Sequence, residues 1–173
     1  MRIVAVEFRG RALATPVGDA IRPTSDRLRQ TVFDILAHRF GDPVTGARVL
    51  DLFAGTGAMG IEAISRGAAY ALFVEDSVEG RGLIRRNVEA LGLTGRTRIF
   101  RRDATELGPA GTVARFGVVF ADPPYRKALG ERALASALAG GWLAPGAIVV
   151  LEEAADVTFA PVAGLTTAEI RAV

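Results

Sequence analysis

The sequence predicts an α/β fold in which a parallel sheet carries helices on both faces. Strand-like and helix-like segments alternate between residues 48 and 151, and a glycine-rich turn follows the first of these strands. Alternation at this pitch is typical of parallel sheets, because each strand needs a crossover, usually a helix, to reach the next. Half of the 173 residues are hydrophobic, which suits one domain with a substantial core. We therefore expect a single domain over residues 1–173.

Residues 1–46 are predicted to extend this domain at its N-terminal side. Residues 2–15 have the pattern of a β-hairpin. A helix follows, for which Thr24 or Ser25 can act as the N-cap. Its apolar stripe consists of Leu28, Val32, Ile35 and Leu36. The catalytic core is then expected over residues 47–173.

The core is predicted to alternate between strands and helices. Apolar runs bounded by turn residues predict the strands, at residues 48–53, 70–74, 97–100, 117–121 and 147–151. Helical periodicity predicts helices at residues 57–66, 77–91 and 127–139, and a short helix or loop at residues 104–110. Residues 166–172 alternate weakly and are the candidate for a last strand.

The composition excludes several classes of function. The chain has no cysteine, which removes disulfides, thiolate metal sites and cysteine nucleophiles. His38 is the only histidine, so a histidine metal cluster is excluded and a Ser/His/Asp triad is disfavoured. No apolar run is long enough to span a bilayer, and the N-terminus enters a strand pattern directly rather than a signal peptide. We therefore expect a cytoplasmic protein without membrane or metal partners.

The charge is small overall but unevenly distributed. The net charge is +2, yet residues 81–102 hold seven arginines against the single acid Glu89. Clustered arginine indicates a polyanionic partner such as a nucleic acid. For any one arginine, solvation of a helix face is the simpler interpretation.

The glycine turn after the first core strand predicts a ligand site. Gly55 and Gly57 allow positive φ and let a ligand approach the backbone closely. The N–H groups that open the following helix favour a negative group. Residues 55–60 also satisfy the pattern G-x-G-x-x-G, so a dinucleotide remains an alternative ligand.

Acidic residues follow three of the predicted strands or end them. Glu75 lies 18 residues after Gly57 and can accept both hydroxyls of a ribose, which is a feature of NAD and S-adenosylmethionine (SAM) sites alike. Asp51 precedes the glycine turn, where it would attract a cationic amine and repel a pyrophosphate. Asp103 either accepts from an adenine amino group or caps the following segment.

The most informative motif is Asp122-Pro123-Pro124-Tyr125, at the end of a predicted buried strand. Both prolines fix their own φ and lack an N–H, so the motif forms a stiff corner. A carboxylate and a carbonyl there can accept both hydrogens of an exocyclic amino group, while a tyrosine ring stacks on a base. The alternative is an ordinary proline-rich turn.

With these acids and the glycine turn in strand order, the chain resembles the class I SAM-dependent methyltransferases. The segment from Arg22 to Leu36, RPTSDRLRQTVFDIL, together with residues 49–57 and the Asp122 corner, is similar to a bacterial family that methylates the exocyclic N2 of a guanine in 16S ribosomal RNA. The resemblance covers nearly the whole chain. It implies a Rossmann-like sheet, SAM as cofactor, and ribosomal RNA as partner within the small subunit or its assembly intermediate, with a monomer as the expected state.

The resemblance also implies roles for individual residues. Asp122, the Pro123 carbonyl and Tyr125 would position the target base. Arg22 and Thr24 would lie near the methionine end of the cofactor. The complete set implied for cofactor binding is Arg22, Thr24, Asp51, Phe53, Ala54, Gly55, Thr56, Gly57, Glu75, Asp76, Asp103, Ala104 and Asp122.

The sequence departs from this family in two places. Val6 stands where the family usually has glycine. The family also continues beyond the position of Val173 with a Tyr-Gly-Asp-Thr stretch and a final antiparallel strand. We therefore expect the last sheet strand to be missing, which would leave a gap beside residues 147–151.

Three other functions stay open at this point. The same corner would serve an amino-group methyltransferase that acts on adenine or cytosine in DNA. The glycine turn and Glu75 would serve an NAD-dependent oxidoreductase, although that reaction offers no use for the corner. The third is a non-catalytic module that binds SAM or RNA. Methylation of a cytosine ring carbon is disfavoured, because it commonly uses a cysteine nucleophile.

Overall fold

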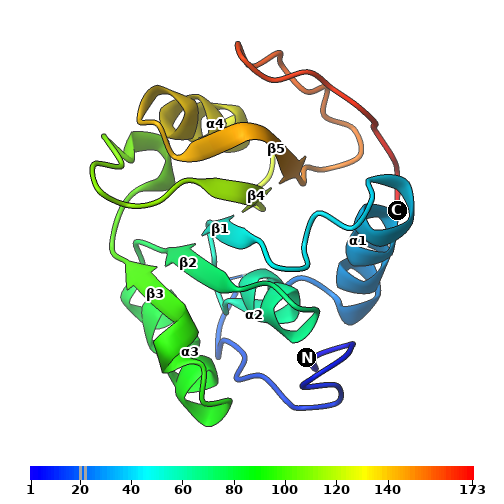
Figure 1. Cartoon of the computed structure of the whole chain (residues 1–173), viewed down its shortest axis with the longest axis vertical. Coiled ribbons are helices and arrows are strands. Elements are labelled where there is room, and N and C mark those ends of the chain that lie inside the picture. Colours follow the sequence, from blue (N-terminus) through cyan, green and yellow to red (C-terminus); the bar gives the residue numbers. More distant parts are fainter. Residues whose placement is uncertain (20, 22) are drawn as a thin grey trace.

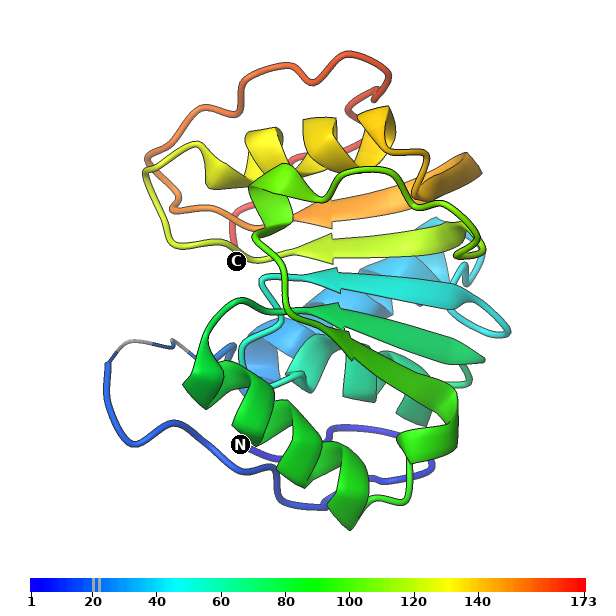
Figure 2. The same cartoon turned by 90° about the vertical axis from the view of Figure 1, so that its left-hand side faces the viewer.

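The computed structural model describes residues 1–19, 21 and 23–173. Its centre is a parallel sheet with the strand order β3-β2-β1-β4-β5. The strands are β1 (Arg48–Leu52), β2 (Tyr70–Val74), β3 (Thr97–Phe100), β4 (Phe116–Ala121) and β5 (Leu143–Leu151). Figure 2 shows all five arrows pointing to the same edge of the sheet. The predicted fold class is confirmed.

Helices cover both faces of the sheet (Figure 1). On one face lie α1 (Asp26–Arg39), α2 (Ala58–Ser65) and α3 (Val78–Ala90), and on the other α4 (Leu129–Ala139). Two short 3-10 turns, η1 (Thr94–Arg96) and η2 (Ala104–Glu106), flank β3. Within the described residues, no helix is long and apolar enough to cross a membrane.

Each face of the sheet has its own hydrophobic core, because successive strand residues point to opposite sides. In β4, Val118 and Phe120 join the core beneath α1 and α2, whereas Val119 joins the core beneath α4. Phe33 of α1 packs on Phe120, with ring centroids 5.4 Å apart. Helix α1 is therefore part of the main core.

The predicted N-terminal hairpin is present only in outline. Arg2 and Ala12 form one antiparallel bridge, and Leu13 N donates to Met1 O, but neither side forms a strand. Ile3 N donates across the hairpin to Arg11 O at 3.0 Å, whereas other N–H groups of the first side bond to α2. Val4 N donates to the Glu62 carboxylate at 2.9 Å, and Phe8 N donates to the Ser65 hydroxyl at 3.0 Å. The first side thus bonds both to the second side of the hairpin and to side chains of α2.

Several other elements differ from their predicted bounds by one residue at an end, and three differ by more. Helix α4 begins at Leu129 rather than residue 127, because Arg126 and Ala128 have positive φ values of 63° and 53°. Strand β5 begins at Leu143 rather than residue 147 and reaches β4 through a register shift. Residues 166–172 form no strand; Glu169 pairs with Arg39 of α1 at 3.0 Å instead.

Strand β5 is the edge strand on its side of the described sheet. Residues 152–173 run past α4 and then to α1 without adding a strand (Figure 1). This agrees with the expectation that no further strand lies beside residues 147–151.

Candidate active site

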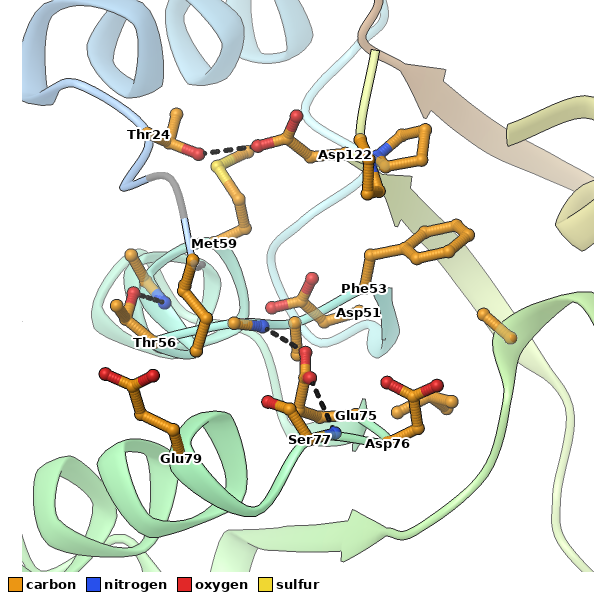
Figure 3. A pocket seen from close by; sticks show the side chains of 18 of the residues that line it. Thr24, Asp51, Phe53, Thr56, Met59, Glu75, Asp76, Ser77, Glu79 and Asp122 are labelled. Atoms are coloured by element: carbon orange, nitrogen blue, oxygen red, sulfur yellow. Dashed lines mark hydrogen bonds between the residues drawn. The ribbon is translucent and has the colours of Figure 1, made fainter. Parts of the chain in front are cut away.

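A pocket of about 400 Å³ opens at the carboxyl ends of β1, β2 and β4 (Figure 3). The strand order reverses between β1 and β4, and ligands of open α/β sheets bind at such a switch point. The described lining residues are Asp19, Ile21, Thr24, Asp51, Phe53, Ala54, Gly55, Thr56, Ala58, Met59, Val74, Glu75, Asp76, Ser77, Glu79, Arg102, Asp103, Ala104, Asp122, Pro123, Pro124 and Tyr125. Seven of these residues are acidic and one is an arginine.

Asp51 lies buried at the floor of the pocket. Its Oδ2 accepts a hydrogen bond from Gly60 N at 3.0 Å. Burial raises the pKa of Asp51 well above its usual range; the Gly60 N–H opposes this rise, and the negative charges of Asp122 and Glu75 add to it. Ionised Asp51 is therefore costly without a cation nearby, and a cationic ligand would relieve that cost.

Glu75 is held in a fixed orientation at the end of β2. Gly55 N donates to its Oε1 at 2.8 Å, and Ser77 N donates to its Oε2 at 3.1 Å (Figure 3). A carboxylate oxygen can accept more than one hydrogen bond, so both oxygens can still receive ligand hydroxyls. The carboxylate thus joins the glycine turn to the start of α3 and faces the pocket.

The glycine turn fits closely between helix and sheet. Gly55 and Gly57 have φ values of 57° and 81°, in the left-handed region that favours glycine. A Cβ on Gly60 would lie 2.5 Å from the Phe73 ring. Phe53 also has a positive φ, 56°, which is uncommon for an aromatic residue and typical of functional sites. Its ring forms part of the pocket wall.

Asp103 has the capping role, which is one of the two roles that the sequence left open. It is the N-cap of η2, where its Oδ1 accepts from the Thr105 N–H at 2.8 Å and from the Thr105 hydroxyl at 2.7 Å. These bonds lower the pKa of Asp103, the side-chain bond most. The same residue lines the pocket beside the buried Ala104. It is therefore a helix cap that also presents a carboxylate to the pocket.

The Asp122 corner closes the opposite end of the pocket. Asp122 follows the last residue of β4, and its Oδ2 accepts from the Thr24 hydroxyl at 2.8 Å. Figure 3 shows the Met59 side chain extending toward this pair. The Tyr125 hydroxyl donates to Glu152 Oε1 at 2.5 Å. The carboxylate and the aromatic ring of the corner are thus both anchored by residues distant in sequence.

The structure brings most of the predicted site residues together. Gly57 is an exception: it is buried behind the pocket wall and begins α2, and a Cβ there would meet Ile84 and Phe73. Its φ of 81° and its place at the start of α2 give it a part in the backbone turn. The prediction for Arg22 lies outside the described residues. The other predicted residues, namely Thr24, Asp51, Phe53, Ala54, Gly55, Thr56, Glu75, Asp76, Asp103, Ala104, Asp122, Pro123 and Tyr125, all line the pocket.

Several lining residues were not predicted from the sequence. Met59 has the spacing of a core residue on α2, and Ser77 and Glu79 look like an ordinary helix start. Their adjacency to the glycine turn and to Glu75 is the only sequence signal that could have indicated them. Within the described residues, no group of three or more metal-ligating side chains is placed to hold a metal ion.

The fold and the site together define a class I methyltransferase: a parallel sheet in the order 3-2-1-4-5, with a glycine turn after β1 and acids at the ends of successive strands. The chain belongs to the family described as conserved hypothetical protein 95, whose model matches residues 1–171.

Two similar proteins that are described as methyltransferases support this assignment. Ribosomal RNA small subunit methyltransferase D of Escherichia coli is 38% identical over 154 residues, which cover 88% of this chain and 74% of that protein. The structure of the E. coli protein yhhF, described as a candidate methyltransferase, superposes with a TM-score of 0.78 and 33% identity, covering 95% of this chain and 86% of that one.

A more distant structural relative is described with its ligands. It is the Thermus thermophilus 16S rRNA N2 G1207 methyltransferase RsmC in complex with AdoMet and guanosine. The TM-score is 0.57 at 27% identity, over 74% of this chain and 34% of that one. The similarity is thus confined to a part of the larger protein.

Proposed function

We propose that this protein transfers a methyl group from SAM to the exocyclic N2 of a guanine in 16S ribosomal RNA of the small subunit. The observation that carries the proposal is the Asp122 corner, where a carboxylate and a tyrosine meet at one end of an acidic pocket. Relatives named as small-subunit methyltransferases support the RNA class, and RsmC supports N2 as the acceptor atom. Ribosomal RNA as substrate makes the cytoplasm the proposed place of action.

The residues of the pocket fit SAM better than a dinucleotide. SAM carries positive charge on its sulfonium and its amino group, and the described lining has seven acidic residues and one arginine. A pyrophosphate would be repelled by Asp51, Glu75 and Asp122, and the last two lie close enough to Asp51 to raise its pKa. Glu75 would accept from the ribose hydroxyls, and Asp103 Oδ2 from the adenine amino group, with Phe53 and Ala104 as apolar walls.

The proposed mechanism depends mainly on alignment. SAM, when bound, supplies an electrophilic methyl group. Asp122 and the Pro123 carbonyl would accept the two N–H bonds of the guanine amino group, which localises the nitrogen lone pair and directs it toward the methyl. Tyr125, oriented by Glu152, would hold the base by stacking. Because the N–H becomes acidic only as the new bond forms, Asp122 needs no raised basicity to receive the proton.

Gly80 provides a test of the Glu75 assignment. A Cβ on Gly80 would lie 2.7 Å and 2.8 Å from two carbon atoms of Glu75 and 2.8 Å from Ser77 Oγ, so Gly80→Ala should displace the Glu75 carboxylate together with the Ser77 hydroxyl. We expect SAM binding, measured by calorimetry, to weaken about 10-fold, or about 1.4 kcal/mol. Gly82→Ala is the matched control, because a Cβ there meets nothing within 4 Å in the same helix. An unchanged affinity in Gly80→Ala would remove Glu75 from the cofactor site.

Asp51 should make cofactor binding dependent on pH. Its raised pKa means that the protonated form dominates until the pH exceeds that pKa, so SAM affinity should increase as the pH rises through it. Asp51→Asn should abolish this dependence and weaken binding about 10- to 100-fold at higher pH, because hydrogen bonds to charged groups contribute about 1.5–3 kcal/mol.

The same change should stabilise the cofactor-free protein. A carboxyl whose folded-state pKa is raised loses folding free energy as it ionises, so Asp51→Asn should raise the Tm at neutral pH. Asp156→Asn, at an exposed position outside the pocket, serves as the control. A pH profile of SAM affinity that is the same in Asp51→Asn and the native protein would contradict this role of Asp51.

The function itself is tested by methyl transfer from labelled SAM to small-subunit particles that lack the modification, followed by identification of the nucleoside. N2-methylguanosine is the expected product. Transfer to duplex DNA instead, or to an adenine or cytosine amino group, would overturn the proposal. Calorimetry with SAM and with NAD covers the case in which no transfer is seen. Binding of SAM would indicate a transferase tested on the wrong substrate, and binding of NAD would indicate an oxidoreductase.

A further inference from the structure

The catalytic corner is joined to the N-terminal segment by Thr24. The Thr24 hydroxyl donates to Asp122 Oδ2 at 2.8 Å across 98 residues of sequence (Figure 3). Thr24 lies directly before Ser25, the N-cap of α1, whose hydroxyl accepts from Leu28 N. The residue that touches Asp122 is therefore fixed to the beginning of a helix that packs on the sheet.

Thr24 is held on its other side by Arg29. Arg29 Nη1 donates to the Thr24 carbonyl at 3.2 Å, and Nη2 donates to the Arg2 carbonyl. Nη2 also pairs with Asp26 Oδ1 at 2.9 Å. One guanidinium thus binds the backbone on both sides of the N-terminal loop, immediately beside the residue that contacts Asp122.

The guanidinium of Arg29 is itself fixed, because it is fully buried. Its Nε lies 4.0 Å from Oε1 of the equally buried Glu62 on α2. Glu62 also accepts from Val4 N at 2.9 Å and lies 3.6 Å from Arg66. A buried charge is retained only where it is paired and hydrogen-bonded, and here every partner belongs to α1, α2 or the N-terminal segment.

We propose that Thr24 and Arg29 are positioning residues for the methyl-transfer step: Arg29 fixes the Thr24 backbone, and the Thr24 hydroxyl fixes the Asp122 carboxylate toward the target base. This inference rests on the proposed function. It changes the role of Thr24 from a cofactor contact to an orienting partner of Asp122. Arg29, which reaches neither the pocket nor the corner, acts only through Thr24.

Orientation of Asp122 matters because the reaction has no strong base to compensate for poor geometry. The amino nitrogen must point at the methyl carbon, and a displacement of about 1 Å can reduce the rate about 100-fold. A carboxylate at the end of a strand can rotate about its side-chain bonds unless a donor holds it. Thr24 supplies such a donor from a rigid helix start.

Two substitutions of Thr24 separate orientation from packing. Thr24→Val keeps the shape and removes the donor, whereas Thr24→Ser keeps the donor. We expect Thr24→Val to lower kcat about 10- to 100-fold on small-subunit particles, with the Kd for SAM within about 3-fold of the native value, and Thr24→Ser to retain most of the activity. Thr31→Val is the matched control, because that hydroxyl bonds only the Arg27 carbonyl within α1 among the described residues.

A second measurement needs neither substrate nor cofactor. Amide hydrogen exchange of residues 24–26 should be faster in Thr24→Val than in Thr24→Ser or Thr31→Val, because the hydrogen bond between Thr24 and Asp122 is lost. Equal exchange in all variants would show that the hydrogen bond between Thr24 and Asp122 does not hold this segment, and would overturn the proposal. Arg29→Lys should reproduce part of the kcat loss, because a single ammonium cannot span the carbonyls of Arg2 and Thr24 as the guanidinium does.

The outcomes for the inference and for the function are distinct. A native protein that transfers no methyl group to RNA overturns the proposed function. An active native protein with an equally active Thr24→Val variant overturns only the positioning role. Weakened SAM binding at unchanged kcat would return Thr24 to the cofactor site, and equal losses in Thr24→Val and Thr24→Ser would reduce its role to packing.

Discussion

Asp122→Ala should lower kcat by at least about 100-fold while the Kd for SAM changes less than about 3-fold. The magnitude follows from other enzymes, in which loss of one preorganised electrostatic contact costs about 100- to 1,000-fold. Asp122 is the carboxylate at the end of β4 that Thr24 holds, and the proposed mechanism gives it the guanine amino group. Single-turnover transfer with saturating SAM measures the chemical step directly.

Asp122→Ala should have only a small effect on SAM affinity, and the direction of that effect can be predicted. The negative charge of Asp122 is one of the causes that raise the pKa of Asp51. Without that charge, Asp51 ionises more easily, so SAM affinity near the pKa of Asp51 should improve slightly rather than decline. Asp156→Ala is the control, because Asp156 is an exposed acid that pairs with Arg126 near the same corner. Turnover that survived in Asp122→Ala would exclude Asp122 as the residue that positions the base.

The elements that the sequence predicts best are those with strictly local signals. Strands β2 and β3 have the predicted bounds, because each is a short apolar or alternating run between turn residues. For a related reason, the sequence predicts that four acids lie at the site, namely Asp51, Glu75, Asp103 and Asp122. Each lies at or after a strand end, and parallel strands bring all their carboxyl ends to one edge of the sheet.

The N-terminal segment could not be predicted in detail, because its partners are distant in sequence. Alternation in residues 2–8 is compatible with a strand, but the backbone groups of Val4 and Phe8 bond to Glu62 and Ser65 of α2. A local pattern cannot distinguish a hairpin partner from a side chain 57 or 58 residues away. The hydrogen-bond partners of the N-terminal segment therefore depend on tertiary structure around α2.

Buried charged residues were missed for a different reason. Periodicity analysis treats Arg29 and Glu62 as the solvated faces of their helices, whereas both are fully buried. Such residues can be placed inside only when their partners are known, since an isolated buried charge is unfavourable. The partner of the Tyr125 hydroxyl could not be predicted either, because Glu152 belongs to the segment after β5.

Arg29→Met should lower the free energy of unfolding by about 3–5 kcal/mol, the usual cost of removing one partner from a buried ion pair. The carbonyls of Arg2 and Thr24 lose a donor, and Glu62 keeps only Arg66 as a described charged partner. Urea unfolding at neutral pH measures the loss. Arg66→Met should cost less, because the Arg66 side chain is 13% exposed whereas that of Arg29 is 0% exposed.

The loss of stability in Arg29→Met should depend on pH if the unpaired charge of Glu62 causes it. Burial raises the pKa of Glu62, while the Val4 N–H and the charges of Arg29 and Arg66 lower it. Ionisation of a carboxyl with a raised folded-state pKa removes stability as the pH rises, and without Arg29 that cost increases. The deficit of Arg29→Met should therefore shrink as the pH falls through the pKa of Glu62.

The double variant Arg29→Met with Glu62→Gln tests the same point at neutral pH. Glutamine keeps an acceptor for Val4 N but carries no charge, so the double variant should be more stable than the sum of the two single changes predicts. The alternative result is that the two changes in the free energy of unfolding add strictly and that the loss in Arg29→Met does not vary with pH. The loss of stability would then come from the carbonyls of Arg2 and Thr24, which lack their donor in this variant. In that case the guanidinium would stabilise the fold chiefly as the tie between the N-terminal loop and α1, which is also the contact through which it would reach Thr24 and Asp122.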